Sequence, residues 1–354
     1  MTTLTQTLPA EALTSGRLPR YTVPVAAVAG VLVGLAVATL AAGGNIGLAA
    51  ALAFVLYLVI MEVAARVVEG ARQASDRRAT NLVTGAFLLA LLPLVSVSWE
   101  AVSKGLARFD ATFFSSSMRN IVGAGGGAVH AIYGTLWVTG IASLISVPIG
   151  LLTSIYLSEY GRGGRLAKAI TFFVDVMTGI PSIVAGLAAY SLMGILAGPG
   201  WKSGLSGSLA LSILMIPVVV RSSEEILRLV PNELREASLA LGVPKWLTIA
   251  RVVIPTAISG LVSAVILAVA RVIGETAPLL IAAGFTASLN NNPLANPMMT
   301  LPVFVYDSYA RPGTEVQAYW DRAWAGALTL ILIVMILNLI GRLVARRFAP
   351  KTGR

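Results

Sequence analysis

The sequence of 354 residues is 56% hydrophobic and 12% charged, and it contains one His and no Cys. Soluble globular proteins carry about 25% charged residues, so this composition excludes a soluble enzyme, a disordered tail and a nucleic-acid-binding module. The absence of Cys excludes disulfides and thiolate metal sites, and one His cannot form an imidazole cluster, so no metal site is expected. The composition, with a mean hydropathy of +0.83, predicts an all-α polytopic membrane protein.

Eight apolar runs approach or exceed the length of about 20 residues that crosses a bilayer as a helix. In chain order they are Thr22–Ala42, Ile46–Val68, Leu82–Ser98, Ala131–Leu157, Ile170–Leu196, Leu205–Val220, Ile254–Ala283 and Ala323–Ile340. Three small or polar residues separate the first two runs, which predicts a tight helical hairpin. Gly30 and Gly34 form a GxxxG pattern that permits close helix contact, with a specific dimer interface as the less favoured interpretation.

Lys and Arg are unevenly distributed among the segments that join these runs. With a cytoplasmic N-terminus, most of the 26 basic residues fall in cytoplasmic segments, and far fewer fall in outer loops. Because basic residues remain on the cytoplasmic side, both termini are expected in the cytoplasm of a cell whose plasma (inner) membrane holds the protein. The basic pI of 10.2 then reflects topology, and membrane lipid rather than nucleic acid is the expected surrounding.

The expected organisation has five parts. A cytoplasmic tail at 1–21 precedes a transmembrane hairpin at 22–68, and a basic cytoplasmic linker at 69–80 follows it. Residues 81–348 form a core of six helices, and 349–354 form a second cytoplasmic tail.

The cytoplasmic loop at 221–255, between the sixth and seventh runs, carries the clearest local pattern. Pro231 suits a first helical turn, Gly242 suits the left-handed residue that ends a helix, and Pro244 begins the next. A small apolar face at helical spacing favours docking into a groove of a partner; its residues are Leu234, Ala237, Ser238 and Leu241. The alternatives are a helix lying on the bilayer and, less favoured because of the acidic residues, a DNA-binding helix–turn–helix.

Ionisable residues also occur within the apolar runs, where they are functional candidates. Arg271 lies about 25 Å beyond Ile254 along a straight helix, and Glu275 follows four residues later on the same face, within pairing distance. The guanidinium could bind a tetrahedral oxyanion, held by Glu275, with the hydroxyl of Thr276 beside them. The alternative is a buried ion pair that only fixes helix packing.

Asp175, in the fifth run, lies about 10 Å beyond Lys168 if the chain is helical between them. A polar link to a neighbouring helix or to the loop cations is the favoured interpretation, and a place in a transport path is the alternative. The segment Gly200–Ser203 lacks the Gly-Lys pair of a phosphate-binding loop. The chain therefore has no ATP site that we can identify, and energy must come from a partner.

Several motifs resemble those of a known family. The pattern Glu236-Ala237-Ser238-x3-Gly242-x9-Val252-x-Ile254-Pro255 resembles the EAA loop of ABC importer permeases, whose coupling helices dock into the ATPase subunit. Four other stretches resemble motifs of phosphate importer permeases: Arg271–Pro278 (R-x-x-G-E-T-A-P), Gly179–Gly186 (G-I-P-S-I-V-x-G), Tyr156–Tyr160 and Met299–Val303. The set is most similar to the PstA branch, although the sister PstC branch shares several motifs.

The resemblance implies a type I ABC importer permease core of six helices, to which this chain adds an N-terminal hairpin. It also implies a homologous PstC-like permease, two PstB-like ATPase subunits, an external PstS-like phosphate-binding protein and a phosphate-sensing signalling partner. The chain would have no catalytic residue and no cofactor of its own, because ATP and Mg²⁺ belong to the partner ATPase. For the additional hairpin a packing or assembly role is expected.

The residue patterns and the resemblance together predict roles for three groups of residues. The substrate path would use Arg271, Glu275 and Thr276; ATPase coupling would use Glu236, Ala237, Ser238 and Gly242; and a structural or path role would fall to Asp175, Pro181 and Ser182. Three alternatives stay open: an importer of molybdate, tungstate or sulfate, an ion-coupled secondary transporter, and a membrane scaffold or signalling subunit.

Overall fold

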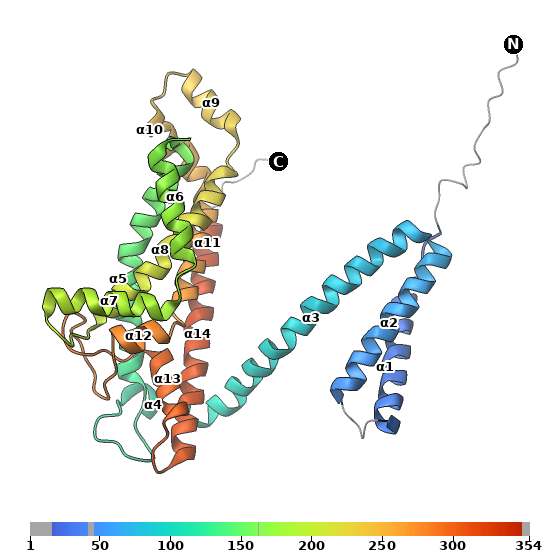
Figure 1. Ribbon diagram of the computed structural model, residues 1–354, viewed down its shortest axis with the longest axis horizontal. Coiled ribbons are helices and arrows are strands. Elements are labelled where there is room, and N and C mark those ends of the chain that lie inside the picture. Colours follow the sequence, from blue (N-terminus) through green and yellow to red (C-terminus); the bar gives the residue numbers. More distant parts are fainter. Residues whose placement is uncertain (1–15, 42–45, 162, 349–354) are drawn as a thin grey trace, which may run out of the picture. The chain divides into compact units, whose positions relative to one another are not determined.

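The computed structural model describes residues 16–41, 46–161 and 163–348, and every regular element within these ranges is helical (Figure 1). Among these residues, six helices are long and apolar enough to cross a membrane, or seven if one bent pair is counted as a single span. The all-helical class predicted from composition is therefore confirmed. The expected tail at 349–354 and most of the tail at 1–21 lie outside the described residues.

The chain forms two compact units, Met1–Ser98 and Trp99–Arg354. In the first unit, α1 (Thr22–Ala41) packs against α2 (Ile46–Val68). A Cβ added to Gly30 would lie 2.6 Å from the carbonyl oxygen of Ala53, and one added to Gly34 would lie 2.5 Å from that of Ala49. The GxxxG face of α1 is thus occupied by the chain's own α2, so it serves the hairpin rather than a dimer.

The basic stretch at 69–80, expected as a linker, is almost entirely helical. Gly70 adopts a φ of +90° between α2 and α3, and α3 then runs unbroken from Ala71 to Gly105. Arg, Gln and Ala are good helix formers, so the polar residues extend the apolar span instead of interrupting it. The two compact units divide within α3, after Ser98.

A carboxylate fixes the corner between α2 and α3. Glu69 accepts hydrogen bonds from Arg77 Nε at 2.5 Å and from the Leu18 N–H at 2.8 Å. These bonds, led by the one from Arg77, hold the pKa of Glu69 below its ordinary value. On the preceding turn, Glu62 pairs with Arg66 at 2.6 Å, as their i,i+4 spacing permits.

The second unit is a helical bundle in which α8 is the most buried span. Its core packs α8 against α5, α7 and α11, while α14 packs against α11 and α13 (Figure 1). The elements after α3 are η2 (Leu106–Arg108), α4 (Ala111–Ser115), α5 (Val129–Ile155), the π-helical turn η3 (Tyr156–Tyr160), α6 (Arg165–Thr178), α7 (Ser182–Ala197), α8 (Gly204–Arg228), α9 (Asn232–Ala240), α10 (Lys245–Thr248), the π-helical turn η4 (Ile249–Val253), α11 (Ile254–Val272), α12 (Ala277–Ala282), α13 (Leu301–Ala310) and α14 (Val316–Phe348).

Two runs expected as single spans are interrupted. The run Ile170–Leu196 divides into α6 and α7, which are bent by 108°, because Pro181 cannot continue a helix and disfavours helical geometry in the residue before it. The run Ile254–Ala283 divides at 273–276 into α11 and α12. Hydropathy missed both breaks because the residues within them are mostly apolar or small.

Several other spans are longer than their apolar runs. The run Ala323–Ile340 lies within the 33-residue α14, and Leu205–Val220 lies within the 25-residue α8. Charged residues extend both helices past the apolar part that a hydropathy window detects.

We predict that Gly34→Ala destabilises the α1–α2 hairpin. The new methyl group would meet the Ala49 carbonyl, and overpacking of this kind costs about 1–3 kcal/mol. Thermal unfolding of the detergent-solubilised protein should show a lower Tm. Gly140→Ala on α5 is the matched control, because nothing lies within 4 Å of its added Cβ. Equal Tm values for the two variants would contradict the close contact.

Candidate functional site

The residues predicted for the substrate path gather around a small cavity in the second unit. Its volume is about 140 Å³, and its lining comes from both interrupted spans and from α8: Met177, Thr178, Ile180, Ser182, Leu214, Pro217, Val218, Arg271, Val272 and Glu275. Arg271, Glu275 and Ser182 are thus brought together from positions up to 93 residues apart in the sequence. Pro181 and Thr276 adjoin the lining without forming part of it.

The expected pairing of Arg271 with Glu275 is not formed. Arg271 lies in the last turn of α11, which ends at Val272, and Glu275 lies beyond the end of that helix. The i,i+4 geometry of a continuous helix therefore does not apply to this pair. Within the part of the chain that the structure describes, no ion pair or hydrogen bond engages either side chain, so both remain available to a ligand in the cavity.

Packing of α7 against α12 holds the two breaks together. A Cβ added to Gly186 would lie 2.7 Å from Pro278 Cα and 2.9 Å from the Pro278 carbonyl oxygen. Gly186 and Pro278 end the two motifs Gly179–Gly186 and Arg271–Pro278. The two motifs therefore pack directly against each other. This contact places Ser182 and Glu275 on the same cavity.

The chemistry of this cavity suits a small oxyanion. The Arg271 guanidinium supplies several N–H donors in a planar fork, which matches tetrahedral or planar oxyanions. The Ser182 hydroxyl can donate or accept a hydrogen bond. Leu214, Pro217 and Val218 supply apolar walls, which strengthen electrostatic interactions by lowering the local dielectric. The carboxylate of Glu275 lines the same cavity and would repel an anion bound there.

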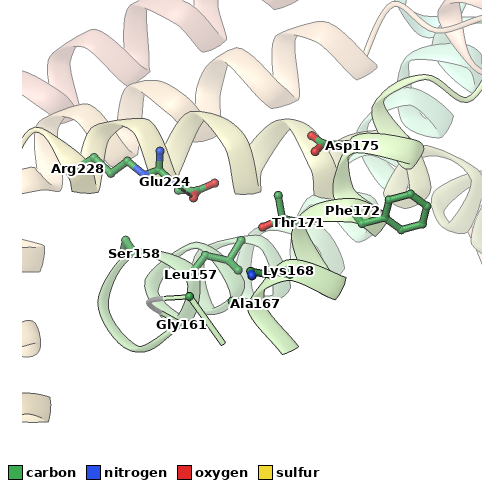
Figure 2. A pocket seen from close by; sticks show the side chains of 11 residues that line it. Leu157, Ser158, Gly161, Ala167, Lys168, Thr171, Phe172, Asp175, Glu224 and Arg228 are labelled. Atoms are coloured by element: carbon green, nitrogen blue, oxygen red, sulfur yellow. Dashed lines mark hydrogen bonds and ion pairs between the residues drawn. The ribbon is translucent and has the colours of Figure 1, made fainter. Parts of the chain in front are cut away.

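A second, larger cavity of about 560 Å³ lies between α6, η3 and α8 (Figure 2). Figure 2 shows Lys168 and Thr171 of α6 on one side and Glu224 and Arg228 of α8 on the other. Glu224 pairs with Arg228 at 2.6 Å. Asp175 also lines this cavity, rather than the one around Arg271.

Asp175 forms the polar link between helices that its sequence position favoured. It pairs with Arg221 of α8, and Arg221 also pairs with Glu224 at 3.1 Å. The anionic groups of the larger cavity are thus neutralised by cations of α8. In the smaller cavity, by contrast, the Arg271 guanidinium has no ion pair or hydrogen bond among the described residues, and its donors remain available to an anion.

The loop at 221–255 contains the two short helices, α9 and α10, that the positions of Pro231, Gly242 and Pro244 predicted. Gly242 has a φ of +78°, and its N–H donates to the Leu239 carbonyl at 2.9 Å, so the predicted left-handed turn between α9 and α10 is present. Leu241 and Trp246 are 84% and 63% exposed, and Glu236 and Ala237 are also exposed. This elbow, residues 231–248, presents an apolar surface with no partner among the residues the structure describes.

Ser238 differs from its expected place on that surface. It is buried, and its Oγ lies 2.9 Å from Oγ1 of Thr248. The helical spacing grouped it with Ala237, but the fold back to α10 covers it. Ser238 therefore joins α9 to α10 inside the elbow and does not form part of its exposed surface.

Sequence reasoning missed two buried ionic side chains of this unit. Glu159 is bound by Arg235, which lies 76 residues away, and no local spacing reveals such a pair. Arg322 is fully buried and donates to the carbonyls of Gly123 and Gly125 at 2.7 and 2.8 Å. The glycine-rich loop therefore supplies carbonyl acceptors to an arginine of α14, which requires its backbone to approach α14 closely.

Comparison with known proteins gives concordant matches. A family model described as "Binding-protein-dependent transport system inner membrane component" matches residues 146–354. The phosphate transport system permease protein PstA 1 of Mycobacterium tuberculosis is 44% identical over 277 residues, which are 77% of this chain and 89% of that protein. The PstA protein of Mycobacterium leprae is 43% identical over 288 residues, 80% of this chain and 92% of that one.

The fold is also similar to a solved membrane transporter. A chain of a bacterial alginate ABC transporter, in complex with an alginate-bound periplasmic protein, matches with a TM-score of 0.52 and 14% identity, covering 82% of this chain and 100% of that chain. At this identity the likeness concerns the fold alone.

We predict that Gly186→Ala loosens the contact between α7 and α12. The added methyl would meet the Pro278 backbone, and a strain of about 1–3 kcal/mol should speed hydrogen exchange of the amides at 273–282 by about tenfold. Gly194→Ala on the same helix meets nothing within 4 Å and gains the same helix propensity, so it should leave that exchange unchanged. The same exchange rate in both variants would show that this contact does not hold the breaks together.

Proposed function

Because the chain belongs to the family of binding-protein-dependent transport system inner membrane components, we propose that it is the transmembrane permease subunit of an ATP-driven importer of inorganic phosphate. It is a multi-pass protein of the inner membrane and works with ATPase and substrate-binding partners. Its role is to form part of the translocation path. The finer proposal adds a PstC-like permease, two PstB-like ATPases and a PstS-like phosphate-binding protein as the partners.

The observation that carries the proposal is the guanidinium of Arg271, which has no ion pair or hydrogen bond among the described residues and lines a small cavity where two spans are interrupted. Irregular backbone at membrane depth is tolerated only where it is buried in protein or lines a cavity. A cationic fork with unused donors at such a place is suited to HPO4(2−) or H2PO4(−). Glu275, on the same cavity, would keep binding weak enough for release.

In this proposal the chain performs no covalent chemistry. The partner ATPases bind ATP and Mg²⁺, close on one another and displace the elbow, and the helices then alternate access to the cavity. Glu236, Ala237 and the turn at Gly242 would contact the ATPase. Ser238 would support this surface from within, because its hydroxyl is engaged by Thr248.

Arg271→Ala should lower phosphate uptake at least about tenfold while leaving the complex assembled. Losing a hydrogen bond to a charged group costs about 1.5–3 kcal/mol, which corresponds to about a tenfold or greater loss of uptake. The measurement is labelled phosphate uptake by cells or proteoliposomes, with excess molybdate, tungstate or sulfate as competitors. Arg342→Ala is the control, since Arg342 is exposed near the end of α14. Normal uptake by Arg271→Ala would reject the site, and uptake of another oxyanion in place of phosphate would reject the ligand.

Gly242→Val should weaken attachment of the ATPase. A β-branched residue resists the φ of +78° found here, so the turn between α9 and α10 should distort. Co-purification of the ATPase with the permease is the measurement, and Gly164→Val, at a glycine with an extended backbone, is the control. Full recovery of the ATPase with the Gly242 variant would show that this turn does not shape the docking surface.

A further inference from the structure

The elbow is held to the turn that follows α5 by an arginine whose side chain is only 12% exposed. Arg235, on α9, donates from Nη2 to Oε1 of Glu159 at 2.8 Å and from Nε to the same oxygen at 3.1 Å. It also donates to the carbonyls of Leu227 and Val230 at 2.9 and 2.5 Å. One guanidinium thus joins the end of α8, the start of α9 and the turn η3.

Lys245 makes a second attachment from the other helix of the elbow. Its Nζ donates to the Glu159 carbonyl oxygen at 2.5 Å and lies 4.9 Å from the centre of the Tyr160 ring. Both helices of the elbow therefore contact Glu159 of η3, and α10 also contacts Tyr160. We call Glu159, Arg235 and Lys245 the clamp.

Burial makes the clamp different from a surface ion pair. The side chains of Glu159 and Arg235 are 4% and 12% exposed, so solvent screens their attraction weakly. Removing one partner of a buried pair leaves an uncompensated charge, which is strongly unfavourable. The elbow cannot separate from η3 without that cost, whereas an exposed bridge would open readily.

At its opposite end, α5 is tied to the start of α13. The Leu301 N–H donates to Oγ1 of Thr135 at 2.7 Å, and both residues are buried. About 24 residues separate Thr135 from Glu159, which is about 36 Å along a helix. Figure 1 shows α9 and α10 at one end of this bundle and α13 toward the other, with α5 running between them.

We propose that the clamp makes the elbow and α5 move as one body, so that ATP-driven displacement of the elbow is delivered along α5 to the Met299–Val303 segment. By its chain connections alone, the elbow would move only α8 and α11. The clamp adds α5 and thereby connects the ATPase surface with the far end of the bundle. Glu159, Arg235 and Lys245 are positioning residues in this account, which rests on the proposed function.

The functional test uses the assembled transporter in proteoliposomes with Glu159→Gln and Arg235→Lys. Glu159→Gln keeps the size of the side chain and removes its charge. We expect phosphate uptake to fall about tenfold or more, while ATP hydrolysis stays within about twofold of the parent. Glu225→Gln, at an exposed position of α8, should change neither rate. Unchanged uptake, or an equal loss of uptake and hydrolysis, would overturn the proposal.

A distance measurement tests the clamp even if phosphate is not the substrate. The chain has no Cys, so spin labels can be placed uniquely at Leu152→Cys on α5 and Ala240→Cys on α9. In the assembled complex with an intact clamp, the distance between the labels should be the same with and without ATP. With Glu159→Gln added, ATP should shift or broaden it. A shift with the intact clamp, or no shift in the Glu159 variant, would overturn the proposal.

Failure of the two proposals is distinguishable. If no variant or parent complex takes up phosphate while the label distances behave as expected, the ligand is wrong and the clamp stands. If uptake is normal in the parent and in Glu159→Gln, the transport function stands and the clamp is wrong.

Discussion

The need to satisfy backbone hydrogen bonds away from water is the constraint on which the site depends. A spanning helix can be interrupted only where other protein groups or water accept the freed N–H and C=O groups. This chain interrupts two spans, at 179–181 and at 273–276, and brings the two breaks to one cavity. The Gly186–Pro278 contact holds them there. The backbone hydrogen bonds that each break loses are therefore lost beside this cavity, where Arg271 and Glu275 can meet a ligand.

In the second unit, the carboxylates around the larger cavity and Arg271 on the smaller one differ in their pairing. The most buried span, α8, organises the bundle, and its cations neutralise Asp175 and Glu224 around the larger cavity. Arg271, in contrast, has no such partner among the described residues. The carboxylates of Asp175 and Glu224 are therefore paired with cations, whereas the charge proposed to bind substrate has no ionic partner among the described residues. The elbow follows the same division, because Arg235, Lys245 and Ser238 bind groups within the unit while Leu241 and Trp246 remain exposed.

Local features of this fold could be predicted from the sequence, and contacts between distant segments could not. The left-handed turn at Gly242 and the membrane character of the spans follow from neighbouring residues. The hydropathy pattern did not reveal the bend at Pro181 or the end of α11 at Val272, because apolar composition does not specify helix continuity. For the same reason, the predicted pairing of Arg271 with Glu275 was wrong, because that prediction assumed a continuous helix. Two other contacts join segments that are far apart in the chain: Glu159 with Arg235, and Arg322 with the glycine-rich loop. No local spacing in the sequence indicates either contact.

The central claim is that the two breaks enclose an aqueous cavity that binds an oxyanion beside Arg271. The most direct measurement is the reaction of Ser182→Cys with a water-soluble thiol reagent in the assembled complex, since only a hydrated thiol ionises and reacts readily. Leu187→Cys, on the exposed apolar side of α7, is the comparison. The account predicts that Ser182→Cys reacts faster than Leu187→Cys and that phosphate slows its reaction. A Ser182→Cys thiol that is as inert as the one at position 187, or that phosphate leaves unprotected, would contradict it.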